Sequence, residues 1–227
     1  MKKLFKSLTK FEKILWGVSL IVVLASFLSV PERDYLTLIA SLVGVSALIF
    51  ISKGNVVGQF LVVIFALLYS VVSVLSQYYG EMITYLFMST PMAICAIVSW
   101  IKHPYSDGEV EVSDITKKQI ATIAVSSALV TVAFYFILGA LGTANLIVST
   151  ISVLTSFVAS YLTFLRSPYY ALGYALNDVV LIVLWILATI EDVSSFPMIL
   201  CFVMFLVNDL YGFINWRRIK NRQQNNN

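Results

Sequence analysis

Residues 196–218 read FPMILCFVMFLVNDLYGFINWRR. The part from Pro197 to Trp216 is almost entirely apolar and matches the length of about 20 residues that a helix needs to cross a bilayer. It ends on Arg217 and Arg218, and basic residues directly after an apolar run are typical of a membrane surface. The stretch therefore predicts a transmembrane helix and an integral membrane protein.

The composition supports this interpretation for the whole chain. Of its 227 residues, 59% are hydrophobic and 12% are charged, and the mean hydropathy is +0.90. A soluble domain carries about 25% charged residues, so this chain has too few to cover a water-facing surface. Soluble enzymes and disordered chains are both excluded. The net charge of +3 is too small to indicate a nucleic-acid partner.

Seven more apolar segments of similar length precede the stretch at 197–216. They are residues 14–30, 35–52, 55–78, 82–101, 118–138, 145–165 and 169–190. We interpret the first as a retained helix rather than a signal peptide, because its apolar run is long and seven more spans follow it. The predicted fold class is all-α, with eight transmembrane helices and one long hydrophilic loop at 102–116.

Basic residues are distributed unevenly between the two sides of the membrane. If the N-terminus lies inside, 14 of the 15 Lys and Arg residues fall on the cytoplasmic side, and only Arg33 falls outside. Cytoplasmic segments of membrane proteins carry such an excess. The sequence therefore predicts a multi-pass protein with both termini in the cytoplasm.

The chain also repeats a pattern at a spacing of 116 residues. Trp100 matches Trp216, each before a basic residue at the end of a span, and Tyr69 matches Trp185. Spans two to four then correspond to spans six to eight, in the same membrane orientation because one helix joins them. We predict a basic N-terminus with an extra first helix (1–31), a first repeat (32–102), a loop and linker helix (103–140), a second repeat (141–219) and a cytoplasmic tail (220–227).

Two Asn-Asp pairs lie at mid-membrane depth, where an ionisable side chain costs about 2.5–3.5 kcal/mol and therefore indicates function. They are Asn177-Asp178 in the seventh span and Asn208-Asp209 in the eighth. Trp185 lies two helical turns after Asp178, on the same face. The predicted substrate-binding residues are Asn177, Asp178, Trp185, Asn208, Asp209, Tyr211, Gln59, Tyr69 and Thr90.

Structural interpretations of the polar and aromatic residues stay open. One alternative is that Asp178 and Asp209 only join helices through hydrogen bonds. Trp100 and Trp216, next to basic residues, are interpreted as belt residues at the membrane surface. Pro91, in the middle of the fourth span, is expected to kink that helix and free carbonyl groups. A serine stripe typical of helix packing marks the sixth span: Ser149, Ser152, Ser156 and Ser160.

These side chains suit a small polar molecule with an aromatic, cationic part. Asn and Gln amides pair with hydroxyl and amide groups, and Trp185 or Tyr69 offers a flat face that also attracts a cation. No Lys or Arg lies at the centre of a span, so a nucleoside is favoured over a nucleotide. The lone His103 and the isolated Cys95 and Cys201 build no metal site, and neither a metal nor a cofactor is predicted.

Three parts of the sequence are similar to the PnuC family of bacterial nicotinamide riboside transporters, which is related more distantly to the SWEET sugar transporters. They are Asn177-Asp178 with Trp185, the stretch NDLYGFINWRR at 208–218, and the Gly80-Glu81 turn followed by Pro91 and Trp100. The resemblance covers the chain from the second span onward.

The resemblance implies a 3+1+3 core, in which two parallel three-helix bundles are joined by one helix and share one site. It implies uptake of nicotinamide riboside, a form of vitamin B3 and a precursor of NAD, by facilitated diffusion with alternating access across the bacterial inner membrane. It leaves a homotrimer open. Proteins resembling this family also carry thiamine or riboflavin. Two other classes remain as alternatives: a membrane enzyme with Asp178 and Asp209 as its carboxylate pair, and a scaffold that does not transport.

Overall fold

The computed structural model describes residues 7–31, 33–76, 78–106 and 108–226; Lys2, Lys3 and Lys6, which enter the predicted charge bias, lie outside these ranges. Within them, eight helices are long and apolar enough to cross a membrane. The chain is thus an all-α integral membrane protein with eight spans, as predicted. The spans comprise α2 (Lys10–Ser29), α3 (Tyr35–Ser52), α4 (Val56–Leu75), α5 (Tyr79–Ile83) with η1 (Thr84–Ser89) and α6 (Thr90–Lys102), α7 (Lys117–Ala140), α8 (Leu146–Phe164), α9 (Tyr170–Glu191) and α10 (Phe196–Asn225).

Polar residues in the predicted turns fix where several helices begin. The Thr9 hydroxyl accepts a hydrogen bond from the Glu12 N–H, and the Glu12 carboxylate accepts one from the Thr9 N–H. Thr116 and Gln119 form the same reciprocal pair at the start of α7. Asp34 caps α3 with its carboxylate. These caps satisfy N–H groups that the first helical turn leaves without partners.

The fourth span is irregular where the sequence places Pro91. Thr84–Ser89 form a π-helix, and α6 resumes at Thr90 with Pro91 in its first turn. Proline has no N–H to donate and its ring clashes with the carbonyl one turn earlier. The Thr90 hydroxyl donates instead to the Tyr85 carbonyl, at 2.8 Å. The disturbance expected at Pro91 thus takes the form of a widened helical turn.

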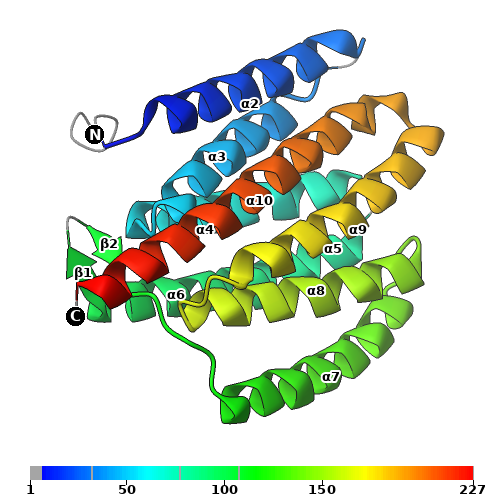
Figure 1. Cartoon of the computed structure of the whole chain (residues 1–227). Coiled ribbons are helices and arrows are strands. Elements are labelled where there is room, and N and C mark those ends of the chain that lie inside the picture. The colour runs from blue at the N-terminus through cyan, green and yellow to red at the C-terminus, as the bar shows by residue number, and fades with distance from the viewer. Residues whose placement is uncertain (1–6, 32, 77, 107, 227) are drawn as a thin grey trace.

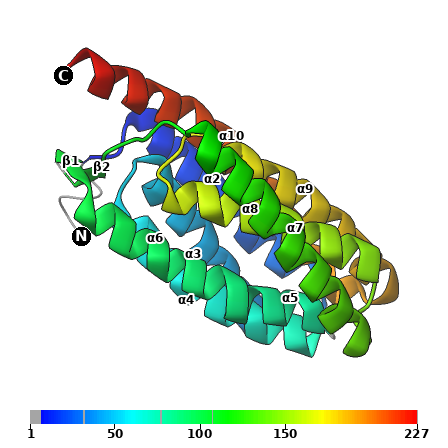
Figure 2. The same ribbon diagram turned by 90° about the horizontal axis from the view of Figure 1, so that it is seen from below.

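Among the described residues, six helices form a closed ring. In this ring α3 packs on α4, α4 on α6, α6 on α8, α8 on α9, α9 on α10, and α10 on α3. The remaining two spans lie outside the ring, α2 against α3 and α10, and α7 against α8 (Figure 1). Seen from below, the helices run side by side along one common direction (Figure 2). The ring is the part of the fold that positions the site.

One end of the bundle differs from the other in its polar groups. Helix α2 begins and α10 ends at this end (Figure 1), and the helix termini that carry Lys53 and Lys102 lie there too. The predicted hydrophilic loop lies at this end as a hairpin of β1 (Pro104–Ser106) and β2 (Glu109–Val110). At the other end, a short 3-10 helix, η2 (Val193–Ser195), precedes α10. We call the two ends the basic end and the opposite end.

Candidate functional site

The ring of six helices encloses a cavity of about 50 Å3. Its wall is formed by α3, α4, α8, α9 and α10 and by η1 of the fourth span, and it is apolar on α3 and α4 and polar on α9. Ligand pockets usually measure about 300–1,000 Å3, so this cavity is contracted and has room for only a few water molecules. The polar side chains that line the cavity, tyrosines included, are Tyr85, Ser89, Ser156, Tyr170, Tyr174, Asn177, Asp178 and Asp209.

Two carboxyl groups face each other in the cavity wall. Asp178 on α9 and Asp209 on α10 lie within hydrogen-bonding reach of one another, and each residue is only 3% exposed. Oδ2 of Asp178 has no hydrogen-bond partner among the described residues. Two carboxylates at this distance repel each other unless a proton or a cation lies between them. The pair therefore makes the cavity suited to a positively charged molecule.

Hydroxyl groups of α8 hold the polar side of the cavity in place. The Thr155 hydroxyl donates to Oδ1 of Asn177 at 2.8 Å, which leaves the NH2 group of this amide free to donate elsewhere. Ser89 of the fourth span and Ser156 of α8 lie 3.4 Å apart across the wall. The serine stripe thus supplies both helix packing and part of the cavity lining.

A layer of aromatic side chains closes the cavity toward the opposite end. The indole N–H of Trp185 donates to the Tyr69 hydroxyl at 2.8 Å. The Tyr69 ring packs edge-on against Tyr85 and Phe202, with centroid distances of 4.4 and 5.6 Å, and Tyr78 packs on Trp185. All five side chains are buried. The predicted residues Tyr69 and Trp185 therefore lie next to the cavity, as its cover.

A second aromatic layer closes the cavity toward the basic end. The rings of Trp100 and Trp216 lie 5.3 Å apart, and Tyr170 packs on Trp216 at 4.8 Å. Their indole N–H groups donate to the backbone carbonyls of Thr163 and Ile51. The prediction that Trp100 and Trp216 are belt residues at the membrane surface is wrong, because both are buried, at 2% and 0% exposure.

Comparison with known proteins gives this architecture a family. Residues 34–218, which include five helices of the ring in full and most of α10, match the sequence profile described as nicotinamide mononucleotide transporter. The chain belongs to this family.

Two relatives and one solved structure align with this chain over nearly its full length. The nicotinamide riboside transporter PnuC of Neisseria mucosa is 28% identical over 228 residues, covering 97% of this chain and 86% of that protein. The protein of the same name from Haemophilus influenzae is 27% identical, covering 93% of this chain and 92% of its own. The crystal structure of the vitamin B3 transporter PnuC aligns with a TM-score of 0.83 and 27% identity, covering 96% of this chain and 94% of that one.

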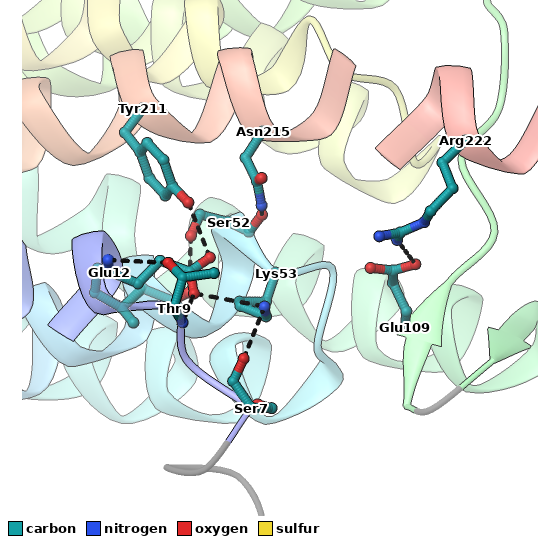
Figure 3. Close-up of polar contacts among 10 residues, drawn as sticks. Ser7, Thr9, Glu12, Ser52, Lys53, Glu109, Tyr211, Asn215 and Arg222 are labelled. Carbon is teal, nitrogen blue, oxygen red and sulfur yellow. Dashed lines mark hydrogen bonds and ion pairs between the residues drawn. The ribbon is translucent and has the colours of Figure 1, made fainter. Parts of the chain in front are cut away.

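Six of the nine predicted binding residues lie outside the cavity lining: Tyr69 and Trp185 form its cover, and the other four make contacts elsewhere. Asn208 donates to the Ser19 hydroxyl of α2 at 3.0 Å and to a backbone carbonyl. The Thr90 hydroxyl donates to the Tyr85 carbonyl within the same span. Gln59 is buried in α4, and its Nε2 has no partner within the described ranges. Tyr211 points toward α2 (Figure 3). Of the nine predicted residues, the structure brings Asn177, Asp178 and Asp209 together in the cavity wall.

The Tyr211 hydroxyl belongs to a polar cluster at the basic end. It donates to Oε1 of Glu12 at 2.9 Å, and Lys53 pairs with the same carboxylate at 3.5 Å (Figure 3). Nearby, Asn215 donates to the Ser52 carbonyl at 2.8 Å. These contacts join α2 to α3 and α10, which explains why one polar face of α10 turns away from the cavity.

Five tyrosine and serine residues of the cavity wall are not among the predicted binding residues, and one of them, Ser156, was predicted as part of the serine stripe. Two of them had a signal, since Tyr170 and Tyr174 lie two turns and one turn before Asp178 on α9, and so share its face. Tyr85 and Ser89 lie in and at the end of the π-helix, and an α-helical spacing does not predict which way they point.

Proposed function

We propose that this protein carries nicotinamide riboside across the bacterial inner membrane. The two relatives compared above are named nicotinamide riboside transporters, and the solved structure is that of a vitamin B3 transporter. The observation that carries the proposal is the makeup of the cavity wall. It combines one amide and two carboxylates with aromatic rings, and no Lys or Arg belongs to its described lining.

Nicotinamide riboside has three chemical features that this wall can recognise. Its ring is a pyridinium cation, which the carboxylates of Asp178 and Asp209 neutralise and the aromatic rings attract through their faces. Its carboxamide matches the Asn177 amide in donors and acceptors. Its ribose hydroxyls match the hydroxyl groups of Tyr85 and Tyr174. A cavity of this kind therefore suits a cationic nucleoside.

A nucleotide fits the same wall poorly, although the family carries the name of one. Nicotinamide mononucleotide adds a phosphate, and no basic side chain of the described cavity lining can pair with it. The two aspartates repel it, and burying an unpaired anion costs several kcal/mol. We therefore assign the nucleoside rather than the nucleotide to this chain.

We propose that transport occurs by alternating access, and the two aromatic layers that close the cavity on both sides support this mechanism. We propose that the ring consists of two parallel bundles, α3 to α6 and α8 to α10, with α7 as the linker, and that these bundles move against each other. Support comes from the two pairs of residues 116 positions apart, because Tyr69 contacts Trp185 and Trp100 contacts Trp216. Equivalent residues of two repeats meet in this way when they lie on the axis that relates them.

The orientation and assembly complete the proposal. We propose that the basic end faces the cytoplasm, since the sequence predicts 14 of the 15 Lys and Arg residues on the cytoplasmic side. We propose facilitated diffusion of the substrate, without coupling of transport to an energy source. A homotrimer stays a prediction of the resemblance. Transport is favoured over catalysis because Asn, not Tyr or Gly, precedes both Asp178 and Asp209, unlike the signatures of aspartyl intramembrane proteases.

Isothermal titration of the detergent-purified protein tests this assignment. We expect micromolar or tighter binding of nicotinamide riboside, and binding of nicotinamide mononucleotide that is weaker by at least about 100-fold, because of its unpaired phosphate. Asp192→Asn, which changes an exposed carboxylate outside the spans, serves as the control and should leave the affinity unchanged. Thiamine and riboflavin are titrated in parallel. If either binds more tightly than nicotinamide riboside, it becomes the proposed substrate. If none of the four compounds binds, the enzyme and scaffold alternatives are favoured again.

A further inference from the structure

A third carboxylate is buried in the membrane-spanning part, away from the cavity lining. Glu81 lies in the first turn of the fourth span, near the opposite end, and its side chain is fully buried. Neither of its carboxylate oxygens has a hydrogen-bond partner among the described residues. The hydroxyls of Thr84 and Ser152, both fully buried, likewise have none. Buried polar groups are normally paired, so this cluster calls for a ligand or a change of conformation that supplies the missing partner.

Two lines of polar residues lead from the cavity to this cluster. On the fourth span, Glu81, Tyr85 and Ser89 follow one another at intervals of four residues, and the last two line the cavity. On α8, Ser156 lines the cavity, and Ser152 lies one turn farther from it and faces Glu81. Ser89 and Ser156 are 3.4 Å apart, which ties the two lines together at cavity level. The seam between the fourth span and α8 is therefore polar from the cavity outward.

The aromatic cover of the cavity separates Glu81 from the central site. Glu81 lies close enough to the Tyr69 and Tyr85 hydroxyls for its charge to act on both. Tyr69 and Tyr85 belong to the layer that must part for a molecule to reach the cavity from the opposite end. The π-helix Thr84–Ser89, which begins one turn after Glu81, gives this segment an irregular backbone of the kind often found at functional sites. Opening of the layer would expose the carboxylate to the path of the substrate.

We propose that Glu81, with the hydroxyls of Thr84 and Ser152, is an outer subsite that recognises the positive charge of the substrate before it reaches the cavity. This inference rests on the proposed transport of nicotinamide riboside. Burial without a partner disfavours the charged form of a carboxyl group, so that an arriving cation restores the charge and is then attracted strongly. Thr84 and Ser152 carry no positive charge that would compete with it. The subsite takes organic cations such as a pyridinium ring, and Glu81 determines the preference for a charged over a neutral nucleoside.

Uptake by liposomes that contain the purified protein tests the inference with two substrates. Nicotinamide riboside carries the pyridinium charge, and its dihydro form has the same shape without the charge. We expect Glu81→Gln to raise the KM for nicotinamide riboside by at least about tenfold and that for the dihydro form by less than about twofold, as expected for a lost charge pair. Glu81→Asp, which keeps the charge, should retain the preference with an intermediate KM.

The outcomes separate this inference from the proposed function. If the wild-type protein carries nicotinamide riboside but Glu81→Gln changes both KM values equally, or neither, Glu81 is structural and the inference is overturned. If the wild-type protein carries neither substrate, the proposed function fails as well. The same assay with uncharged sucrose in place of the Na+ salt should give the same result. A Glu81 effect that disappears without Na+ would mean that the carboxylate binds an inorganic ion, which also overturns the inference.

Discussion

The double variant Asp178→Asn/Asp209→Asn is expected to weaken nicotinamide riboside binding by at least about 100-fold, whereas each single substitution weakens it about tenfold or less. The two carboxyl groups lie within hydrogen-bonding reach of each other in the cavity wall. Either one alone therefore leaves a negative charge beside the pyridinium ring, and only the double variant removes it. Isothermal titration of the four proteins gives the coupling between the two positions.

The neutral dihydro form of the substrate is the control for this double variant. Asn has nearly the size of Asp and keeps an oxygen for hydrogen bonding. Affinity for the neutral form should therefore change by less than about threefold, since little except charge is lost. A double variant that binds nicotinamide riboside as well as the single variants would show that the aspartates join helices and do not bind substrate.

The second large effect is expected at the aromatic cover. Trp185→Ala should lower the free energy of unfolding by about 3–5 kcal/mol, as is usual when a buried aromatic side chain is truncated. It should also weaken nicotinamide riboside binding by more than about tenfold, because the cavity then opens toward the opposite end. Trp185 is 1% exposed and packs on Tyr69 and Tyr78. Thermal unfolding in detergent and titration measure the two effects separately.

Tyr69→Phe is the matched control for the cover. It removes the same 2.8 Å hydrogen bond to Trp185 and keeps the aromatic ring. Its cost should be about 1 kcal/mol or less, the usual value of one hydrogen bond between membrane helices. Equal effects of Tyr69→Phe and Trp185→Ala would assign the stability to the hydrogen bond rather than to packing. Unchanged substrate affinity in Trp185→Ala would show that the layer does not close the site.

The eight spans were predictable because an apolar run of about 20 residues is a strong and local signal. The predicted ends differ from the observed ends by only a few residues in most spans. The last helix differs most, since α10 continues to Asn225 through a polar sequence. Its Gln223 side chain accepts from the Val112 N–H and donates to the Val110 carbonyl. Such a contact between segments far apart in the chain leaves no local signal in the sequence.

The site was predictable only in part, because the sequence gives the depth of a residue but not the direction in which it points. Asn208 and Asp209 lie at one depth, yet Asp209 lines the cavity and Asn208 bonds to Ser19 on α2. Adjacent residues of a helix point about 100° apart, so the choice depends on which helix lies on which side. The extra helix α2 gives a polar residue a partner outside the ring, and the sequence does not reveal that position.

The tryptophans near the basic end also show that the sequence does not reveal the direction in which a side chain points. Trp100 and Trp216 each lie near basic residues, which is typical of a belt at the membrane surface. In the structure they face inward and contact each other. Their spacing of 116 residues was the better signal, because equivalent residues near the axis between two repeats come together. Glu81 was predicted only as part of a turn with Gly80.

Uptake of labelled nicotinamide riboside into liposomes that contain the purified protein is the most direct test of transport by this ring of helices. The experiment uses no kinase, no ion gradient and no membrane potential. We expect saturable uptake that stops when the inside concentration equals the outside concentration, and no uptake of nicotinamide mononucleotide. Tight binding in detergent without any uptake by the liposomes would contradict transport and favour a receptor or scaffold.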